Sequence, residues 1–324
     1  MVTNNKNEDE VKYAIECKNL TKKFGNFTAV NSSDLKIKKG ELFGFLGPNG
    51  AGKTTTIKIL TTLLSPTFGE AKVAGFDIKT GAASVRARIG VVPQEFALFG
   101  ELTPMENLWY IGELFGMKKD GLKKRSEELL KKVELFDKKD IAAEGFSGGM
   151  KQRLSVAAGL LHTPEILFMD EPTTGLDPQS RIALRELTKS LNDSGITVVY
   201  TTHDMDEADK LCQRIAIMDA GKIKAEGTPK ELKEKYGGGQ KIELRLSRYD
   251  ARLLEELKKI SGAKSVLNKN GIIELKIDAP KTGILHKLSR FLAEKGIEVD
   301  EIRLIESSLE DVFINLTKKE VKNT

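Results

Sequence analysis

The feature that most constrains this chain is the glycine-rich segment at residues 47–55, which lies between an apolar run and an amphipathic segment. It reads Gly-Pro-Asn-Gly-Ala-Gly-Lys-Thr-Thr and matches the pattern Gly-x4-Gly-Lys-Thr. Glycines let the backbone turn tightly and let successive N–H groups approach phosphate oxygens. Residues 41–46 predict a strand and residues 54–64 predict a helix, whose N-terminus carries partial positive charge. The segment therefore predicts a loop that binds the phosphates of a nucleotide.

Two side chains at the end of this loop carry its chemistry. Lys53 supplies positive charge for the β- and γ-phosphates, and the Thr54 hydroxyl completes a Mg²⁺ site. The alternative is a glycine turn that precedes a lysine by coincidence. We expect the whole loop to contact nucleotide, namely Gly47, Pro48, Asn49, Gly50, Ala51, Gly52, Lys53, Thr54 and Thr55.

A second apolar run, residues 165–171, ends in two adjacent carboxylates. A continuous apolar run is typical of a strand buried on both faces of a parallel sheet, and open α/β sheets bind ligands at the carboxyl ends of their strands. We expect Asp170 to hold Mg²⁺ through water and Glu171 to orient or deprotonate the attacking water. The alternative is a strand that ends at the surface in solvated acids.

Two more polar residues follow predicted strands. The β-rich run at residues 196–202 ends at His203, and a short apolar run precedes Gln94. His203 is expected to hydrogen-bond a γ-phosphate, and Gln94 to reach the metal or the water. The alternatives are an incidental surface histidine and an ordinary loop glutamine. The assignment of Gln94 depends on a family pattern.

Taken in order, these motifs resemble those of the ATP-binding cassette (ABC) ATPases over residues 12–235. The resemblance identifies residues 47–55 as the Walker A loop, Asp170 and Glu171 as Walker B, and His203 as the switch histidine. It adds Phe24 as the A-loop aromatic that stacks on adenine, Gln94 as the Q-loop, Ser147-Gly148-Gly149 as the signature, and Gly175-Leu176-Asp177 as the D-loop.

One departure from the family pattern is Phe146, where the commonest signature has leucine. An aromatic residue there resembles the drug- and polysaccharide-exporting cassettes of the daunorubicin-resistance type. It leaves the Ser147, Gly148 and Gly149 donors intact. Phe24 replaces the more usual tyrosine and keeps a ring face for stacking.

The resemblance implies an α/β fold, a P-loop NTPase cassette over residues 1–236 with a RecA-like core, a β-subdomain and a helical subdomain near residues 95–150. It implies hydrolysis of ATP with Mg²⁺, in a head-to-tail homodimer or heterodimer of cassettes that drives a separate transmembrane permease. In this pattern the catalytic residues are Glu171, His203 and Gln94, the residues around the metal are Thr54, Gln94 and Asp170, and Phe24, Ser147, Gly148, Gly149 and Asp177 contact nucleotide.

The bulk properties agree with a protein at the cytoplasmic face of the membrane. No apolar run approaches the ~20 residues of a membrane span, and residues 1–12 lack the apolar region of a secretory signal. Cys17 and Cys212 are isolated, which favours a reducing compartment. The net charge of +5 arises from 52 basic and 47 acidic side chains that are interspersed, so no nucleic-acid partner is expected.

The helical subdomain carries six large apolar side chains of interest. By resemblance it docks on a membrane partner, and these side chains either line a docking groove or form the subdomain's own core. They are Phe96, Leu98, Phe99, Trp109, Phe115 and Met117.

A second domain is predicted at residues 240–324, after a linker at Gly237-Gly238-Gly239. The spacing of its apolar residues predicts strands and helices in the order βαββαβ, which is typical of a ferredoxin-like domain, and a terminal helix follows. No cluster of histidine, cysteine or paired acids lies there. We expect this domain to have an accessory role, which is structural, dimer-supporting or regulatory.

Two rival functions remain for the whole chain. One is a soluble ABC ATPase that acts on nucleic acid or ribosomes, although such families usually carry two cassettes, a long coiled coil or zinc-binding cysteine pairs. The other is a ligand-gated regulator with the second domain as sensor.

Overall fold

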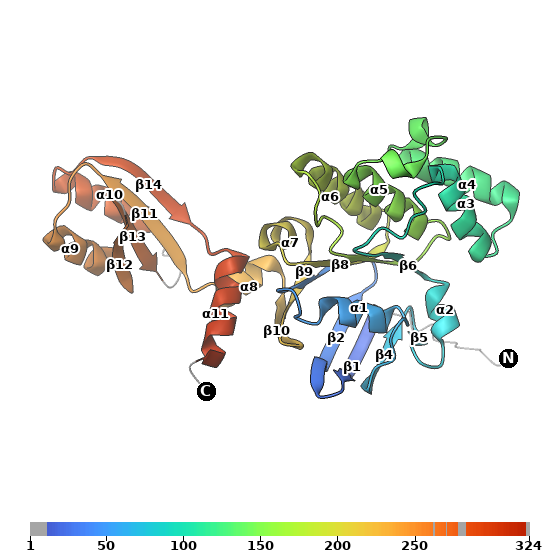
Figure 1. Cartoon of the computed structure of the whole chain (residues 1–324). Coiled ribbons are helices and arrows are strands. Elements are labelled where there is room, and N and C mark those ends of the chain that lie inside the picture. Colours follow the sequence, from blue (N-terminus) through green and yellow to red (C-terminus); the bar gives the residue numbers. More distant parts are fainter. Residues whose placement is uncertain (1–11, 262, 270, 278–282, 322–324) are drawn as a thin grey trace, which may run out of the picture. The chain divides into compact units, whose positions relative to one another are not determined.

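The computed structural model describes residues 12–261, 263–269, 271–277 and 283–321. The expectation about a signal sequence in residues 1–12 lies almost wholly outside the described residues. The chain divides into two compact units, Met1–Thr228 and Pro229–Thr324 (Figure 1). Among the described residues, no helix is both long enough and apolar enough to cross a membrane.

A six-stranded sheet organises the first unit, in the strand order β10-β9-β3-β8-β7-β6. Strands β9, β3, β8, β7 and β6 run parallel, and β10 pairs antiparallel with β9. Every residue of β3, β7 and β8 is buried, as expected for apolar strands with both faces covered. The strands are β3 (Leu42–Leu46), β6 (Ile89–Val92), β7 (Ile166–Asp170), β8 (Thr197–Thr202), β9 (Arg214–Asp219) and β10 (Lys222–Gly227).

An antiparallel sheet with the order β2-β1-β4-β5 covers one face of the parallel sheet together with helix α1. Its inward side chains, such as Ile15 and Val30, join Phe43 and Phe168 of the parallel sheet and Leu60 of α1 in one core. The elements on this side are β1 (Tyr13–Phe24), β2 (Phe27–Lys38), α1 (Lys53–Leu60), β4 (Phe68–Val73), β5 (Phe76–Asp77) and α2 (Ala82–Arg86).

Helices cover the other face of the parallel sheet (Figure 1). Four of them begin at a residue whose side chain accepts a backbone N–H of the first turn, an arrangement that stabilises a helix start. These cap residues are Thr103, Ser147, Asp177 and Asp204. The helices are α3 (Pro104–Leu114), α4 (Lys119–Lys132), α5 (Gly148–Gly159), α6 (Pro178–Asp193) and α7 (Met205–Leu211), with short 3-10 turns at Phe136–Lys138 and Ala143–Gly145.

The second unit contains a four-stranded antiparallel sheet in the order β12-β13-β11-β14. Helices α9 and α10 pack on one face of it through Leu257 and Leu288. The predicted βαββαβ order is therefore confirmed, and the terminal helix is present. The elements are α8 (Pro229–Tyr236), β11 (Gln240–Leu246), α9 (Ala251–Ser261), β12 (Ser265–Lys269), β13 (Ile272–Ile277), α10 (Ile284–Glu294), β14 (Val299–Ile305) and α11 (Leu309–Val321).

The boundary between the units lies before α8, whereas the sequence led us to place it after residue 236. Helix α8 packs against α11, and Asn315 Nδ2 donates to the carbonyl of Tyr236 at 2.9 Å. The predicted glycine linker packs closely beside this contact: a Cβ at Gly237 would lie 2.3 Å from Cβ of Ser307, which precedes α11. Local periodicity cannot reveal such a pairing, because α8 and α11 are distant in sequence.

Helix α8 should therefore depend on α11 for its stability. A chain that ends at Gly238 is expected to exchange the amide hydrogens of residues 229–236 as fast as an unfolded peptide, since a short isolated helix is marginal in water. Hydrogen exchange detected by mass spectrometry would compare this chain with the full-length protein, and a chain that ends at Thr228 is the control for the integrity of the first unit. Equal protection of α8 in the full-length chain and in the one ending at Gly238 would contradict the pairing.

Candidate functional site

The loop at residues 47–55 connects β3 to α1, and its glycines are required by close backbone contacts. A Cβ at Gly47 would lie 2.2 Å from the carbonyl oxygen of Met218. Gly52 has φ +104, and a Cβ there would lie 2.4 Å from the carbonyl oxygen of Ala29. The backbone therefore follows a path that other residues cannot adopt without displacing β9 and β2.

The amine of Lys53 lies beneath this loop and joins it to the end of β7, the strand on the far side of β8. Lys53 Nζ donates to the carbonyls of Gly47 at 2.7 Å and Pro48 at 3.1 Å. It also forms an ion pair with Glu171 at 3.1 Å, and the two side chains are only 3% and 6% exposed. The structure thus brings the predicted phosphate-binding lysine and the predicted general base into direct contact.

Asp170 lies beside the start of α1. Its Oδ1 accepts hydrogen bonds from the hydroxyls of Thr54 at 3.1 Å and Thr201 at 2.6 Å. Among the described residues no three or more histidine, cysteine or acidic side chains form a metal cluster. A Mg²⁺ ion at this point would therefore depend on Thr54, Asp170, water and phosphate oxygens, a donor set that suits Mg²⁺.

Glu171 has an unusual backbone conformation, with φ +46, which side-chain-bearing residues rarely adopt. Its N–H donates to Thr201 Oγ1 at 2.9 Å. Its Oε2 accepts from Thr174 Oγ1 at 3.3 Å and lies 3.0 Å from His203 Nδ1. Burial alone raises the pKa of Glu171, but hydrogen bonding and the positive charge of Lys53, together with His203, hold this pKa below its usual value.

His203 follows β8 at the edge of the site and is 49% exposed. Its contact with Glu171 places it in the same cluster as Lys53 and Asp170. Neither Thr174 nor Thr201 was expected from the sequence to be part of this cluster. A signal for Thr201 was present, because two consecutive threonines end a strand that runs parallel to the Asp170 strand.

The signature segment and the D-loop meet each other. Ser147 caps α5 and Asp177 caps α6, and Ser180 Oγ donates to Asp177 Oδ2 at 2.6 Å. A Cβ at Gly149 would lie 2.2 Å from the same Ser180 Oγ. Hydrogen bonds from Ser180 lower the pKa of Asp177. No hydrogen bond or ion pair between described residues joins the 147–149 segment to the loop at residues 47–55.

Gln94 and Phe24 lie apart from the cluster. Gln94 is exposed in the loop after β6, and no hydrogen bond between described residues connects it to Asp170 or Glu171. Phe24 ends β1 beside the turn into β2, with an exposed ring and the Lys22 amine 5.1 Å from the ring centroid. The structure therefore leaves these two predictions without a contact to the central residues.

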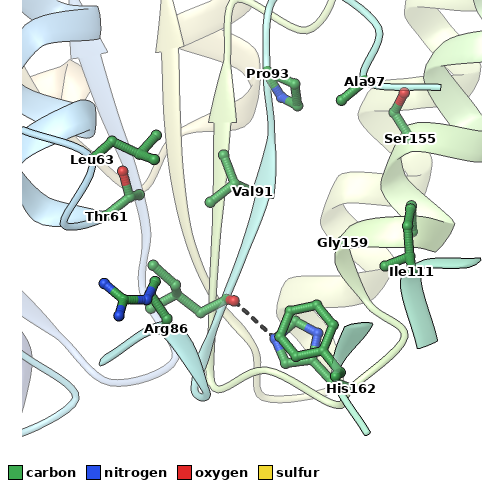
Figure 2. A pocket seen from close by; sticks show the side chains of 13 residues that line it. Thr61, Leu63, Arg86, Val91, Pro93, Ala97, Ile111, Ser155, Gly159 and His162 are labelled. Carbon is green, nitrogen blue, oxygen red and sulfur yellow. Dashed lines mark hydrogen bonds between the residues drawn. The ribbon is translucent and has the colours of Figure 1, made fainter. Parts of the chain in front are cut away.

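A groove of about 290 Å³ lies between the parallel sheet and helices α3 and α5, and no residue of the loop at residues 47–55 lines it (Figure 2). His162 stacks on Phe115 with ring centroids 3.9 Å apart, and its Nε2 lies 2.9 Å from the carbonyl oxygen of Ile89. Leu63, which is 67% exposed, forms part of the rim. Of the six apolar side chains singled out in the sequence, Phe96, Phe99 and Phe115 are exposed, and Leu98, Trp109 and Met117 are partly buried.

The ion pair makes a prediction for the protein without nucleotide. Lys53→Met should lower the free energy of unfolding at pH 7 by about 3 kcal/mol, because it leaves a buried carboxylate without its cation. In the native protein the lowered pKa of Glu171 stabilises the fold at pH values above the ordinary pKa of glutamate. This contribution is lost as the pH falls through the folded-state pKa. In the variant burial raises the pKa of Glu171 above its native value, so the deficit should shrink as the pH falls from the raised pKa of the variant to the lowered pKa of the native protein.

Urea unfolding of both proteins across this pH range measures the deficit. Lys58→Met is the matched control, since Lys58 is exposed on the same helix. A deficit that stays constant with pH would contradict the assigned ion pair.

Comparison with known proteins identifies both units. The family described as ABC transporter matches residues 30–174. The family described as ATP-binding protein DrrA1-3-like, C-terminal domain, matches residues 227–317. The second match begins just before α8, in agreement with the structural boundary.

Similar proteins match along nearly their whole length. The linearmycin resistance ATP-binding protein LnrL of Bacillus subtilis is 39% identical over 95% of this chain and 100% of its own. The daunorubicin/doxorubicin resistance ATP-binding protein DrrA of Streptomyces peucetius is 40% identical over 94% of this chain and 92% of its own. The Nod factor export ATP-binding protein I of Cupriavidus metallidurans is 35% identical, with 95% and 99% covered.

Solved structures resemble the first unit. The ATP-binding cassette MJ0796 in a dimeric post-hydrolysis state with ADP and Pi has a TM-score of 0.60 and 32% identity, and the match covers 66% of this chain and 98% of that one. An ATP-binding subunit of an ABC transporter has a TM-score of 0.63 and 28% identity, with 69% and 93% covered. This chain therefore belongs to the ABC transporter family as an ATP-binding, ATP-hydrolysing cassette with a DrrA-like C-terminal domain.

Proposed function

We propose that this chain is the ATPase subunit of an ABC-2-type exporter of a drug, lipid or polysaccharide. It works as a head-to-tail dimer of cassettes, identical or different, at the cytoplasmic face of the membrane, and drives a separate transmembrane permease. The observation that carries the proposal is the match to the resistance and export proteins, which extends over at least 92% of their lengths and includes the C-terminal domain. None of these names describes an action on nucleic acid or ribosomes, so that alternative is not favoured.

Binding of ATP begins at the loop of residues 47–55, where backbone N–H groups and Lys53 receive the phosphates. In the structure the Lys53 amine forms its ion pair with Glu171. The triphosphate carries more negative charge than one carboxylate, so it draws the amine of Lys53 away from Glu171. Loss of the cation raises the pKa of Glu171 and makes it a better base at the moment when substrate arrives. The ion pair thereby couples binding to activation.

Hydrolysis requires a positioned water and neutralised phosphate charge. Thr54, Asp170 and, after movement of its loop, Gln94 would hold Mg²⁺, which supplies charge neutralisation across the β- and γ-phosphates. Glu171 accepts a proton from the attacking water, and His203, which contacts Glu171, hydrogen-bonds the γ-phosphate. Phe24 offers its exposed ring to the adenine.

The position of the signature supports the proposed dimer. The N–H groups of Gly148 and Gly149 lie in the first turn of α5, where a helix leaves its donors free for an anion. No hydrogen bond or ion pair between described residues joins them to the loop at residues 47–55 of the same chain, and Asp177 caps the adjoining helix α6. We therefore assign them to the nucleotide of a second cassette, so that ATP closes the dimer and its hydrolysis opens it. The C-terminal domain adds surface to this dimer and no catalytic groups.

Replacement of the general base tests this cycle. Glu171→Gln keeps the shape of the side chain but not its basicity, so ATP should still bind while hydrolysis slows by about 10²–10⁴-fold. The ATP-bound variant should then accumulate as a dimer in size-exclusion chromatography. Glu165→Gln, at an exposed carboxylate just before the same strand, is the control and should turn over ATP normally. Wild-type turnover by Glu171→Gln would refute the assignment.

The groove is the proposed docking site for the permease. It presents mostly apolar surface together with the stacked pair of His162 and Phe115, which suits the apolar face of a helical segment. Leu63 lies on its rim and contributes nothing to the nucleotide site.

Leu63→Arg should therefore release the permease during co-purification and leave ATP affinity unchanged, because it places a charge on an apolar contact surface. Leu267→Arg, at an exposed leucine in the second unit, is the matched control. Retention of the permease by Leu63→Arg, or its equal loss in both variants, would contradict docking at the groove.

A further inference from the structure

Glu207 is a buried carboxylate that no step of the proposed hydrolysis uses. It lies in the first turn of α7 and is 4% exposed. Its backbone N–H donates to Asp204 Oδ1 at 3.0 Å, which fixes the start of the helix. Burial of a carboxylate is unfavourable unless hydrogen bonds compensate for lost water, so its partners indicate what it does.

One oxygen of Glu207 joins two segments of the catalytic site. Oε2 accepts hydrogen bonds from Thr173 Oγ1 at 2.8 Å and from Thr202 Oγ1 at 2.9 Å. Both threonines are buried. Thr173 follows Glu171 by two residues, and Thr202 directly precedes His203. The carboxylate thus connects the chain after the general base to the chain before the switch histidine.

Further contacts constrain the pair of hydrogen bonds from Thr173 and Thr202 to Glu207, which we call the Glu207 bridge. Thr202 Oγ1 also accepts from the N–H of Asp204 at 3.0 Å, so the turn that carries His203 is bound to the same network. Burial and the negative charge of Glu207 raise the pKa of the neighbouring Tyr200 well above its usual value. Displacing the carboxylate would therefore disturb buried groups on β8 as well as on the loop after β7.

The backbone of Glu171 explains why such a bridge is needed. Its φ of +46 is a conformation that a residue keeps only where its surroundings hold it. Thr201 holds it from the N–H side, with a hydrogen bond of 2.9 Å. The Glu207 bridge holds the chain on the other side, through Thr173.

We propose that Glu207 is a positioning residue, whose carboxylate binds Thr173 and Thr202 together and thereby sets the separation of Glu171 and His203. This inference rests on the roles proposed above for Glu171 and His203. Among the described residues no hydrogen bond or ion pair joins the Glu207 side chain to the loop at residues 47–55, and the one connection through its partners is the Gly47 N–H, which donates to the backbone carbonyl of Thr202 at 3.4 Å. That bond does not involve the Thr202 hydroxyl, so the inference concerns the hydrolytic step. Loss of the bridge should therefore lower kcat and leave ATP affinity unchanged.

The test measures steady-state ATP hydrolysis and equilibrium ATP binding with the full-length protein. Glu207→Ala should lower kcat by about tenfold or more at unchanged ATP affinity, since small displacements of reacting groups have effects of this size. Glu207→Gln should restore most of the rate, because its amide oxygen still accepts both hydroxyls. Asp206→Asn is the matched control: it removes a charge from the same turn of α7 at an exposed side chain and should leave kcat unchanged.

Thr173→Val and Thr202→Val provide independent variants, since valine matches threonine in shape and removes the donor. Each should lower kcat, and Thr173→Val added to Glu207→Ala should slow the enzyme no further, as expected for residues in one interaction. These two variants decide the matter if Glu207→Ala fails to fold.

Wild-type kcat in Glu207→Ala or in both threonine variants would overturn the inference. So would an equal loss in Glu207→Ala and Glu207→Gln accompanied by a parallel loss of ATP affinity and thermal stability, which would show a structural role alone. Glu171→Gln, measured in the same series, separates this outcome from failure of the site itself. If Glu171→Gln is inactive and Glu207→Ala is fully active, only the positioning role is wrong.

Discussion

The buried ion pair between Lys53 and Glu171 is the interaction on which the site depends. It joins the phosphate-binding loop after β3 to the end of β7, and each partner is held by further bonds, Lys53 by the loop carbonyls and Glu171 by Thr174 and His203. A lysine and a glutamate are both unfavourable when buried alone, so each stabilises the position of the other. In the proposed cycle, the ion pair keeps Glu171 occupied until a phosphate competes for the amine of Lys53.

The parallel arrangement of the strands brings Lys53 and Glu171 together. β3, β7 and β8 lie side by side, and their carboxyl ends carry the loop, the two acids and the histidine. The convergence of these groups on one site could be predicted from the sequence, because strand ends in a parallel sheet meet at one edge and each motif follows an apolar run. The direct contacts of Glu171 with Lys53 and His203 were seen only in the structure. The order of helices and strands in the second unit could also be predicted from the sequence, since the spacing of its apolar residues changes from one element to the next.

Other features depended on contacts between distant residues, which local pattern does not encode. The pairing of α8 with α11 moved the unit boundary, and the glycines between α8 and β11 serve close packing instead of a free linker. The left-handed backbone of Glu171 and its support by Thr201 are likewise products of the assembled sheet. No hydrogen bond between described residues joins Gln94 to Asp170 or Glu171, so its proposed role rests on a movement of its loop.

The central claim is that each ATP is hydrolysed between the phosphate-binding loop of one cassette and the signature of another. Lys53→Ala removes the first and Ser147→Arg blocks the second, so either variant alone should be inactive. Mixing them should restore part of the ATPase activity, because a mixed dimer pairs one intact loop with one intact signature. Absence of activity at every mixing ratio, with both variants folded and able to dimerise, would contradict a shared site.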